Sequence, residues 1–202
     1  MSDKTDAGRL RVLVVSHTGE LGGAERALLR LIAASDRRVD ISLLTMAEGP
    51  FVDEARRTGI PVRVVDGGAA VRVTRAQAGS LGGAAASAGG TVALARRVRR
   101  AIREEDADLL VANSLKAAVL LGLVSGRRRW VWHLHDRLAT DYLATPVVLA
   151  LRVLARFGPR RIVANSLATA STAGRLPSGR VAVAYPGIES SAFARPKRSP
   201  GR

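Results

Sequence analysis

Three histidines are the only imidazoles in this 202-residue chain, and each follows an apolar run. His133 and His135 lie in the stretch WVWHLHD, which ends in Asp136, and His17 closes the run RVLVVSH. Side chains alternate between the two faces of a strand, so His133 and His135 would share one face, with His135 nearer the strand end. A histidine beside an aspartate can orient hydroxyl groups, accept a proton or stabilise a phosphate. His135 and Asp136 are therefore the candidate catalytic pair.

Two other interpretations of the histidines stay open. His133 or His135 could be a core residue whose ring is hydrogen-bonded to the backbone. A metal site would need His17 as a third ligand, and the sequence gives no spacing that groups it with the other two, so we expect no metal ion. The chain has no cysteine, which excludes disulfides, thiolate metal ligands and a thiol nucleophile. The motif G-x-S-x-G of a serine nucleophile is also absent.

A glycine pair, Gly22 and Gly23, follows the first apolar run in the stretch HTGELGGAER. Glycines before a helix let a ligand approach the free N–H groups at its N-terminus, an arrangement that favours phosphate. The alternative is a tight turn with no ligand. The stretch lacks the Gly-Lys-Ser/Thr of a P-loop and the G-x-G-x-x-G of a dinucleotide site. Glu25, just inside the helix, and Lys116, at the start of a later helix, are further candidate ligand-binding residues.

The tetrapeptide VANS occurs twice, at residues 111–114 and 163–166, each time between an apolar run and a helical pattern. Asn and Ser are good N-caps, so one residue of each pair is expected to cap the helix. The other could face a ligand and bind a hydroxyl group. The candidate binding residues here are Asn113, Ser114, Asn165 and Ser166.

Strand and helix patterns alternate along the chain, which predicts an α/β fold: a doubly wound, Rossmann-like parallel sheet of about seven strands with helices on both faces. The predicted strands are Arg11–His17, Val39–Met46, Ile60–Asp66, Asp108–Ser114, Arg129–Asp136, Arg161–Ser166 and Arg180–Ile188. The predicted helices cover 24–35, 50–59, 91–106, 115–126, 140–157 and 167–174. Ligands bind such sheets beyond the carboxyl ends of the strands, where the candidate residues fall.

The predicted domain covers residues 11–193, with a flexible Gly/Ala-rich loop at 67–90, a disordered start at 1–10 and a disordered basic tail at 194–202. The net charge is +15. Only three of the 32 basic residues are lysines, and aromatic residues make up 3%, so nucleic-acid binding is not favoured. The basic cluster at 96–104 is either a solvated helix face or a contact for an anionic membrane or an acidic ligand. No signal peptide or membrane span is evident, so we expect a cytoplasmic protein, with peripheral contact at the inner membrane face as an option.

The ordered motifs RVLVVSHTGELGGAERALLRLI, DLLVANSLKAAVLLG, WVWHLHD, RIVANSLATA and VAVAYPGIESSAF resemble the N-terminal half of the family-4 glycosyltransferases of the GT-B fold. The resemblance spans about residues 11–193. It implies retaining transfer of a sugar from a nucleotide-sugar co-substrate to an acceptor hydroxyl of a glycan, lipid or small molecule, with no cofactor and no metal. The glycine loop would face the donor phosphates, and His135 would lie at the reaction centre.

The chain departs from that family in two ways. The sequence ends soon after YPGIESSAF, where the family's donor-binding C-terminal domain would begin, and Tyr185-Pro186 replaces the usual Asn of that segment. We therefore expect a truncated product, an excised domain or a subunit of a split enzyme, with that domain as its missing partner. Alone, the chain should lack donor binding and turnover. The alternatives are a non-catalytic binding module and a basic protein that binds membrane or nucleic acid.

Overall fold

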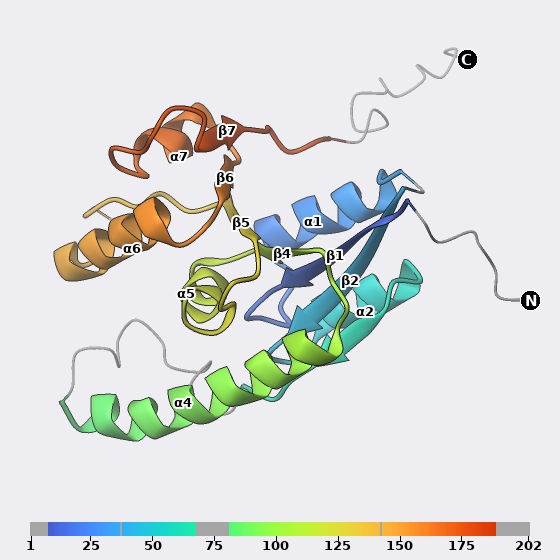
Figure 1. The fold of residues 1–202 in the computed structure, drawn as a ribbon, viewed down its shortest axis with the longest axis horizontal. Coiled ribbons are helices and arrows are strands. Elements are labelled where there is room, and N and C mark those ends of the chain that lie inside the picture. Colours follow the sequence, from blue (N-terminus) through green and yellow to red (C-terminus); the bar gives the residue numbers. More distant parts are fainter. Residues whose placement is uncertain (1–7, 37, 68–80, 142, 189–202) are drawn as a thin grey trace, which may run out of the picture.

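The computed structural model describes residues 8–36, 38–67, 81–141 and 143–188, and they form a parallel α/β sheet (Figure 1). The strand order is β3-β2-β1-β4-β5-β6-β7, and every neighbouring pair is parallel. The predicted α/β class and the seven strands are confirmed. The strands are β1 Leu10–Val15, β2 Val39–Thr45, β3 Val62–Val64, β4 Leu109–Ala112, β5 Trp130–Leu134, β6 Arg161–Ala164 and β7 Val181–Val183.

Helices cover both faces of the sheet because the central strands are apolar on both sides. Val12 and Val14 of β1 pack with residues of α1 and α2, whereas Leu13 and Val15 pack with residues of α4 and α5. The largest core side chain, Trp132 of β5, belongs to the second group. The helices are α1 Gly23–Ala33, α2 Pro50–Arg57, α4 Leu81–Glu104, α5 Leu115–Val124, α6 Thr145–Phe157 and α7 Leu167–Ser171.

The direction in which the chain winds across the sheet reverses between β1 and β4, although the two strands are parallel. From β1 the chain winds outward through β2 to β3, returns through α4 to β4, and then winds the other way to β7. The chain therefore leaves β1 toward α1 on one face of the sheet and leaves β4 toward α5 on the other. Ligands of such sheets bind at this switch point, beyond the carboxyl ends of the strands, and the candidate residues after β1 and β4 lie there.

Several predicted boundaries were wrong. Helix α4 begins at Leu81, so residues 81–90 are helical and do not belong to the predicted loop. This stretch has four alanines and four glycines, so its intrinsic propensity does not select a helix. The helix extends from its later turns, which pack on the core through Leu94 and Val98. Leu10, predicted to lie outside the domain, pairs with Val39 in β1. The predicted loop residues 68–80 and the basic tail 194–202 lie outside the described residues.

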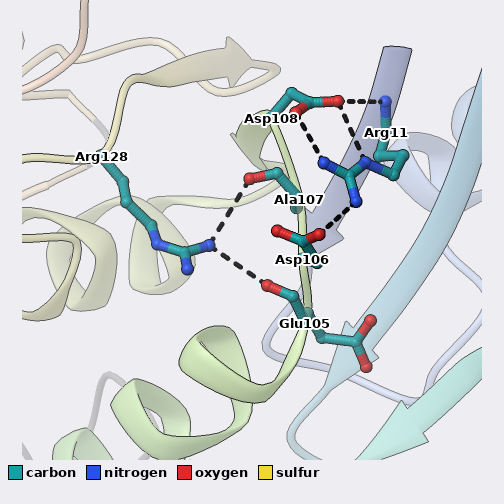
Figure 2. A network of polar contacts seen from close by, with 6 residues as sticks. All are labelled: Arg11, Glu105, Asp106, Ala107, Asp108 and Arg128. Atoms are coloured by element: carbon teal, nitrogen blue, oxygen red, sulfur yellow. Dashed lines mark hydrogen bonds and ion pairs between the residues drawn. The ribbon is translucent and has the colours of Figure 1, made fainter. Parts of the chain in front are cut away.

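Arginine side chains fix the connection between α4 and β4 at the opposite, amino edge of the sheet (Figure 2). The Arg11 guanidinium donates to both carboxylate oxygens of Asp108, at 3.0 and 3.3 Å, and to Asp106. Arg128 donates to the carbonyl oxygens of Glu105 and Ala107 at 3.2 and 3.5 Å. These bonds tie the end of α4 to the start of β1 and so hold β4 beside β1.

Candidate functional site

The carboxyl edge of the sheet brings together most of the predicted site residues. His17 follows β1, Asn113 follows β4, and His135 with Asp136 follows β5. Glu25 comes from the first turn of α1 and Lys116 from the first turn of α5. The charges of Lys116 and Asp136 both act on the pKa of His17, and the charge of Asp136 acts on that of Glu25. These groups from four segments of the chain therefore lie close enough to share one electrostatic environment.

The two histidines of β5 stack against each other. The centroids of the His133 and His135 rings lie 4.0 Å apart, with an angle of 50° between the ring planes. Both rings are on the same side of the strand, as the alternation of side chains requires, while Trp132 and Leu134 point into the core on the other side. The structure thus places His133 beneath His135 and not in a separate core position.

Two asparagines hold His135 from the strands on either side of β5. Asn113 Oδ1, beyond β4, lies 3.0 Å from His135 Nε2, and Asn165 Nδ2, beyond β6, donates to the His135 carbonyl oxygen at 3.1 Å. One asparagine thus orients the ring and the other fixes the backbone. The convergence of the two VANS segments on one histidine could not be predicted from the sequence, because it depends on the strand order β4-β5-β6.

The serines of the same two segments act as helix caps. Ser114 Oγ accepts the N–H of Ala117 at 3.1 Å, at the start of α5. Ser166 Oγ accepts the N–H of Thr169 at 3.1 Å, at the start of α7. The capping role that the sequence predicted for one residue of each pair therefore belongs to the serine, and the asparagine is left to face the site.

All three imidazoles are held neutral at pH 7. Burial lowers the pKa of His17, His133 and His135 to about 4 each, since the charged ring loses hydration. Nearby Lys116 lowers the pKa of His17 further, and His135 does the same to His133. A neutral imidazole accepts a proton or hydrogen bond at one nitrogen and donates at the other, so the site offers acceptors as well as donors.

Buried polar atoms without a hydrogen-bond partner among the described residues gather at this edge. They include Ser16 Oγ, His17 Nδ1, Asn113 Nδ2 and Asn165 Oδ1. An unpaired buried polar atom costs on the order of 1–3 kcal/mol, and such atoms concentrate where a ligand completes the bonding. Ser16, fully buried after β1, was not predicted; its place beside His17 was the only signal for it.

The glycine pair occupies the start of α1. Gly22 is the N-cap residue and no side chain caps the helix at this position. The Glu25 carboxylate turns back over Gly22, with its Oε2 2.8 Å from the position that a Cβ on Gly22 would take, and so covers part of the predicted phosphate position. Burial raises the pKa of Glu25. A Cβ on Gly23 would meet open space, so nothing in the fold requires glycine there.

A different glycine pair holds the loops together. A Cβ on Gly19 would lie 2.1 Å from the carbonyl oxygen of Glu48, and Gly49, with φ of +151°, lies against the Gly19 backbone. Gly19 O also accepts the N–H of Phe51 at 2.8 Å. The loops after β1 and β2 therefore touch backbone to backbone, which sets the path of the chain into Gly22 and Gly23.

Two other features bear on the site. Within the described residues, no group of three or more His, Cys, Asp or Glu side chains could hold a metal ion. A shallow groove of about 550 Å³ lies at the amino edge and is lined by Arg11, Val39, Pro61 and their neighbours, with none of the predicted site residues. We place the candidate site at the carboxyl edge nonetheless, because the arginine in that groove is already paired with acidic residues (Figure 2).

Comparisons with known proteins agree on one family. The sequence model described as Glycosyltransferase Family 4 matches residues 21–192. The structure superposes on Anabaena Alr3699/HepE, solved in complex with UDP and glucose, with a TM-score of 0.67 and 25% identity. It also resembles the lipopolysaccharide outer core galactosyltransferase WaaB (TM-score 0.57, 10% identity) and MurG of Acinetobacter baumannii (TM-score 0.51, 10% identity), which shows a shared fold. No curated protein gives a significant match.

The shares of each chain that superpose are unequal. The match covers 90% of this chain and 45% of the HepE chain, 87% and 45% for WaaB, and 89% and 47% for MurG. This chain thus spans about half the length of the solved structures that it resembles, and it has the architecture of one half of a GT-B glycosyltransferase.

Proposed function

The chain belongs to glycosyltransferase family 4, and from this premise we propose that it is the acceptor-binding half of a retaining glycosyltransferase. In the reaction, the bond between the anomeric carbon and the phosphate oxygen of a nucleotide sugar breaks. A bond from the same carbon to an acceptor hydroxyl oxygen forms with the same anomeric configuration, the hydroxyl proton is lost, and the nucleoside diphosphate leaves. The described sheet, from Leu10 of β1 onward, would form this half, and a second α/β domain would hold most of the donor.

The observation that carries this proposal is the convergence of five side chains beyond the carboxyl ends of β1, β4 and β5: His17, Glu25, Lys116, His135 and Asp136. Lys116 and the N–H groups at the start of α1 are suited to the donor phosphates. The likeness to HepE, which binds UDP and glucose, supports a uridine nucleotide sugar as the donor. The Glu25 carboxylate would have to move away from Gly22 before a phosphate could take this position.

His135 acts as a neutral group in this proposal. With a pKa lowered to about 4, its ring does not protonate the leaving phosphate at pH 7. Its Nε2 is held by Asn113 Oδ1, so Nδ1 remains as the acceptor for a sugar hydroxyl. Asp136, next in sequence, is the candidate to take the proton from the acceptor hydroxyl. Ser16, His133, Asn165 and Ser166 would support these groups and not contact the reacting atoms.

Reconstitution tests the proposal. The chain is co-expressed with the donor-binding half of a family-4 enzyme, and release of UDP from UDP-glucose is measured with and without acceptors. We expect activity only when both halves are present, its loss in His135→Ala, and its retention in Arg127→Ala, a control on the exposed loop after α5. Equal activity in His135→Ala and the parent would refute the site assignment.

Donor binding to the reconstituted pair gives a second measure. Titration of the pair with UDP-glucose, followed by amide and imidazole NMR of this chain, should shift Gly22, Gly23 and the ring of His135. Shifts without turnover in the reconstituted pair would favour a non-catalytic binding module. A titration that moves none of these signals would contradict the donor-phosphate role.

A further inference from the structure

Helix α6 exposes an apolar face in addition to the one that it buries. Val148, Leu151 and Ala155 are buried against the core. On the opposite side, the exposed residues recur at helical spacing: Pro146, Leu149, Ala150, Val153 and Phe157. Leu149 is 58% exposed, Val153 59% and Phe157 76%. One exposed charged residue, Arg156, lies at the edge of this row, with its guanidinium carbon 5.6 Å from the centre of the Phe157 ring. The rest of the row is apolar, which is unusual for a helix that faces water.

The apolar row continues onto the neighbouring helix. On α5, Val119 and Leu123 are also exposed, and Leu123 is 65% exposed. The two helices touch, because a Cβ on Gly122 of α5 would lie 2.6 Å from Leu154 Cδ1 of α6. Figure 1 shows α5 between α4 and α6 on one side of the sheet. We call the exposed apolar residues of α5 and α6 the apolar ridge.

Helix α4, next to the apolar ridge, carries a row of exposed arginines. The buried side of this helix holds Leu94, Val98 and Ile102, and its exposed side holds Arg96, Arg97, Arg99, Arg100 and Arg103. Arg100 pairs with Glu104, at 2.8 Å, whereas the other four make no ion pair with any described residue. Arginines without acidic partners on an exposed face leave a positive field for an outside partner.

Acidic residues are absent from the rest of this layer. The sequence has no Asp or Glu between Asp108 and Asp136, a segment that includes α5, and none within α6. The basic residues of the same region include Arg127, Arg129, Arg156 and Arg160. A symmetric contact between two copies of this face would therefore set arginines against arginines, so a second copy of the chain fits poorly.

We propose that the outer surface of α4, α5 and α6 docks on an anionic phospholipid bilayer. The apolar ridge enters the boundary between headgroups and acyl chains, and the α4 arginines bind lipid phosphates. This combination of apolar and cationic groups matches a bilayer surface better than an acidic protein, which would satisfy the arginines and leave Phe157 and Leu149 in water. The proposal does not depend on sugar transfer.

Vesicle co-sedimentation of the chain tests the proposed docking on a bilayer. Phosphatidylcholine vesicles are compared with vesicles that contain about one third phosphatidylglycerol. We expect binding only to the anionic vesicles. The Arg96→Gln/Arg99→Gln double variant should bind on the order of 25-fold more weakly, since each arginine near the surface is worth about 1 kcal/mol, or about fivefold. Leu149→Ser/Val153→Ser should also weaken binding, because two central side chains of the apolar ridge no longer enter the bilayer.

Matched controls sit on the other face of the sheet. Leu31→Ser and Arg26→Gln alter an exposed apolar and an exposed basic residue of α1, and both should bind like the parent. Thermal unfolding of every variant confirms that the fold is kept. Binding that is equal on neutral and anionic vesicles, or unchanged in both double variants, would overturn the proposal. So would a dimer in sedimentation that Leu149→Ser/Val153→Ser dissociates.

Discussion

Acidification should destabilise the fold before its carboxylates are protonated, because three buried imidazoles must take up charge. His17, His133 and His135 have pKa values of about 4 in the folded chain, against an ordinary value of 6.5. Between these two pH values the unfolded chain binds more protons than the folded chain. The free energy of unfolding therefore rises with pH from about 4 to 6.5 and is constant above that window.

The size of the effect follows from the two pKa values. At pH 5, one such group lowers the free energy of unfolding by about 2 kcal/mol relative to neutral pH. The three rings are partly exposed, and water reduces this to roughly 1 kcal/mol each. The sum is about 3 kcal/mol, a large part of the 5–15 kcal/mol that is typical of a domain. Glu25 acts in the opposite direction, since its raised pKa favours the folded state as the pH falls.

Urea unfolding at about pH 7 and pH 5 measures this difference, and His133→Gln tests its source. Glutamine keeps a polar side chain but does not titrate in this range, so the difference should fall by about one third, or roughly 1 kcal/mol. The paired carboxylates Glu104 and Asp108 contribute little between pH 7 and pH 5, since their folded pKa values are lowered and their stabilisation is lost mainly as the pH falls below the ordinary carboxylate pKa of about 4. An unchanged pH dependence in His133→Gln, or NMR titration of the rings near 6.5, would refute the reasoning.

Three further outcomes follow from the contacts. Gly19→Ala should lower the free energy of unfolding by about 3 kcal/mol, because the new Cβ would lie 2.1 Å from the Glu48 carbonyl oxygen. Gly23→Ala, where a Cβ meets open space, should leave the melting temperature within about 2 °C of the parent. Equal shifts in the two variants would contradict the assigned contact. Ser114→Ala should cost about 1 kcal/mol in chemical unfolding through loss of the α5 cap, and a neutral result would mean that the cap adds nothing. Asn113→Ala should give His135 a mixture of tautomers in ¹⁵N NMR while Asn165→Ala, which holds the backbone, should not; identical spectra would refute the ring contact.

The strands could be predicted from the sequence because they are short and strongly apolar. The run LVV of β1 and the alternation in WVWHL each predicted burial that the structure has. The boundary of α4 could not be predicted in the same way. Its first turns are rich in alanine and glycine, which have no apolar period, so only packing of the later turns through Leu94 and Val98 selects the helix.

The site was predictable as a list of residues and not as a set of contacts. A polar residue after an apolar strand indicates the carboxyl edge, and His17, Asn113 and His135 were all found by that rule. The rule does not say which strands are neighbours. The contact of Gly19 with Glu48 and the stacking of His133 on His135 depend on backbone distances of a few ångströms, and no spacing in the sequence encodes those distances.

The repeated VANS segment shows how one local rule can serve two purposes. Its serine satisfies the N–H groups of the next helix, which fixes the direction of the asparagine just before it. Because β4 and β6 both border β5, the two asparagines reach His135 from opposite sides, one at the ring and one at the backbone. A buried neutral imidazole held at both points has little freedom to reorient. Under the proposed function, its remaining nitrogen would meet a sugar hydroxyl in a fixed direction, as a group at a reaction centre must.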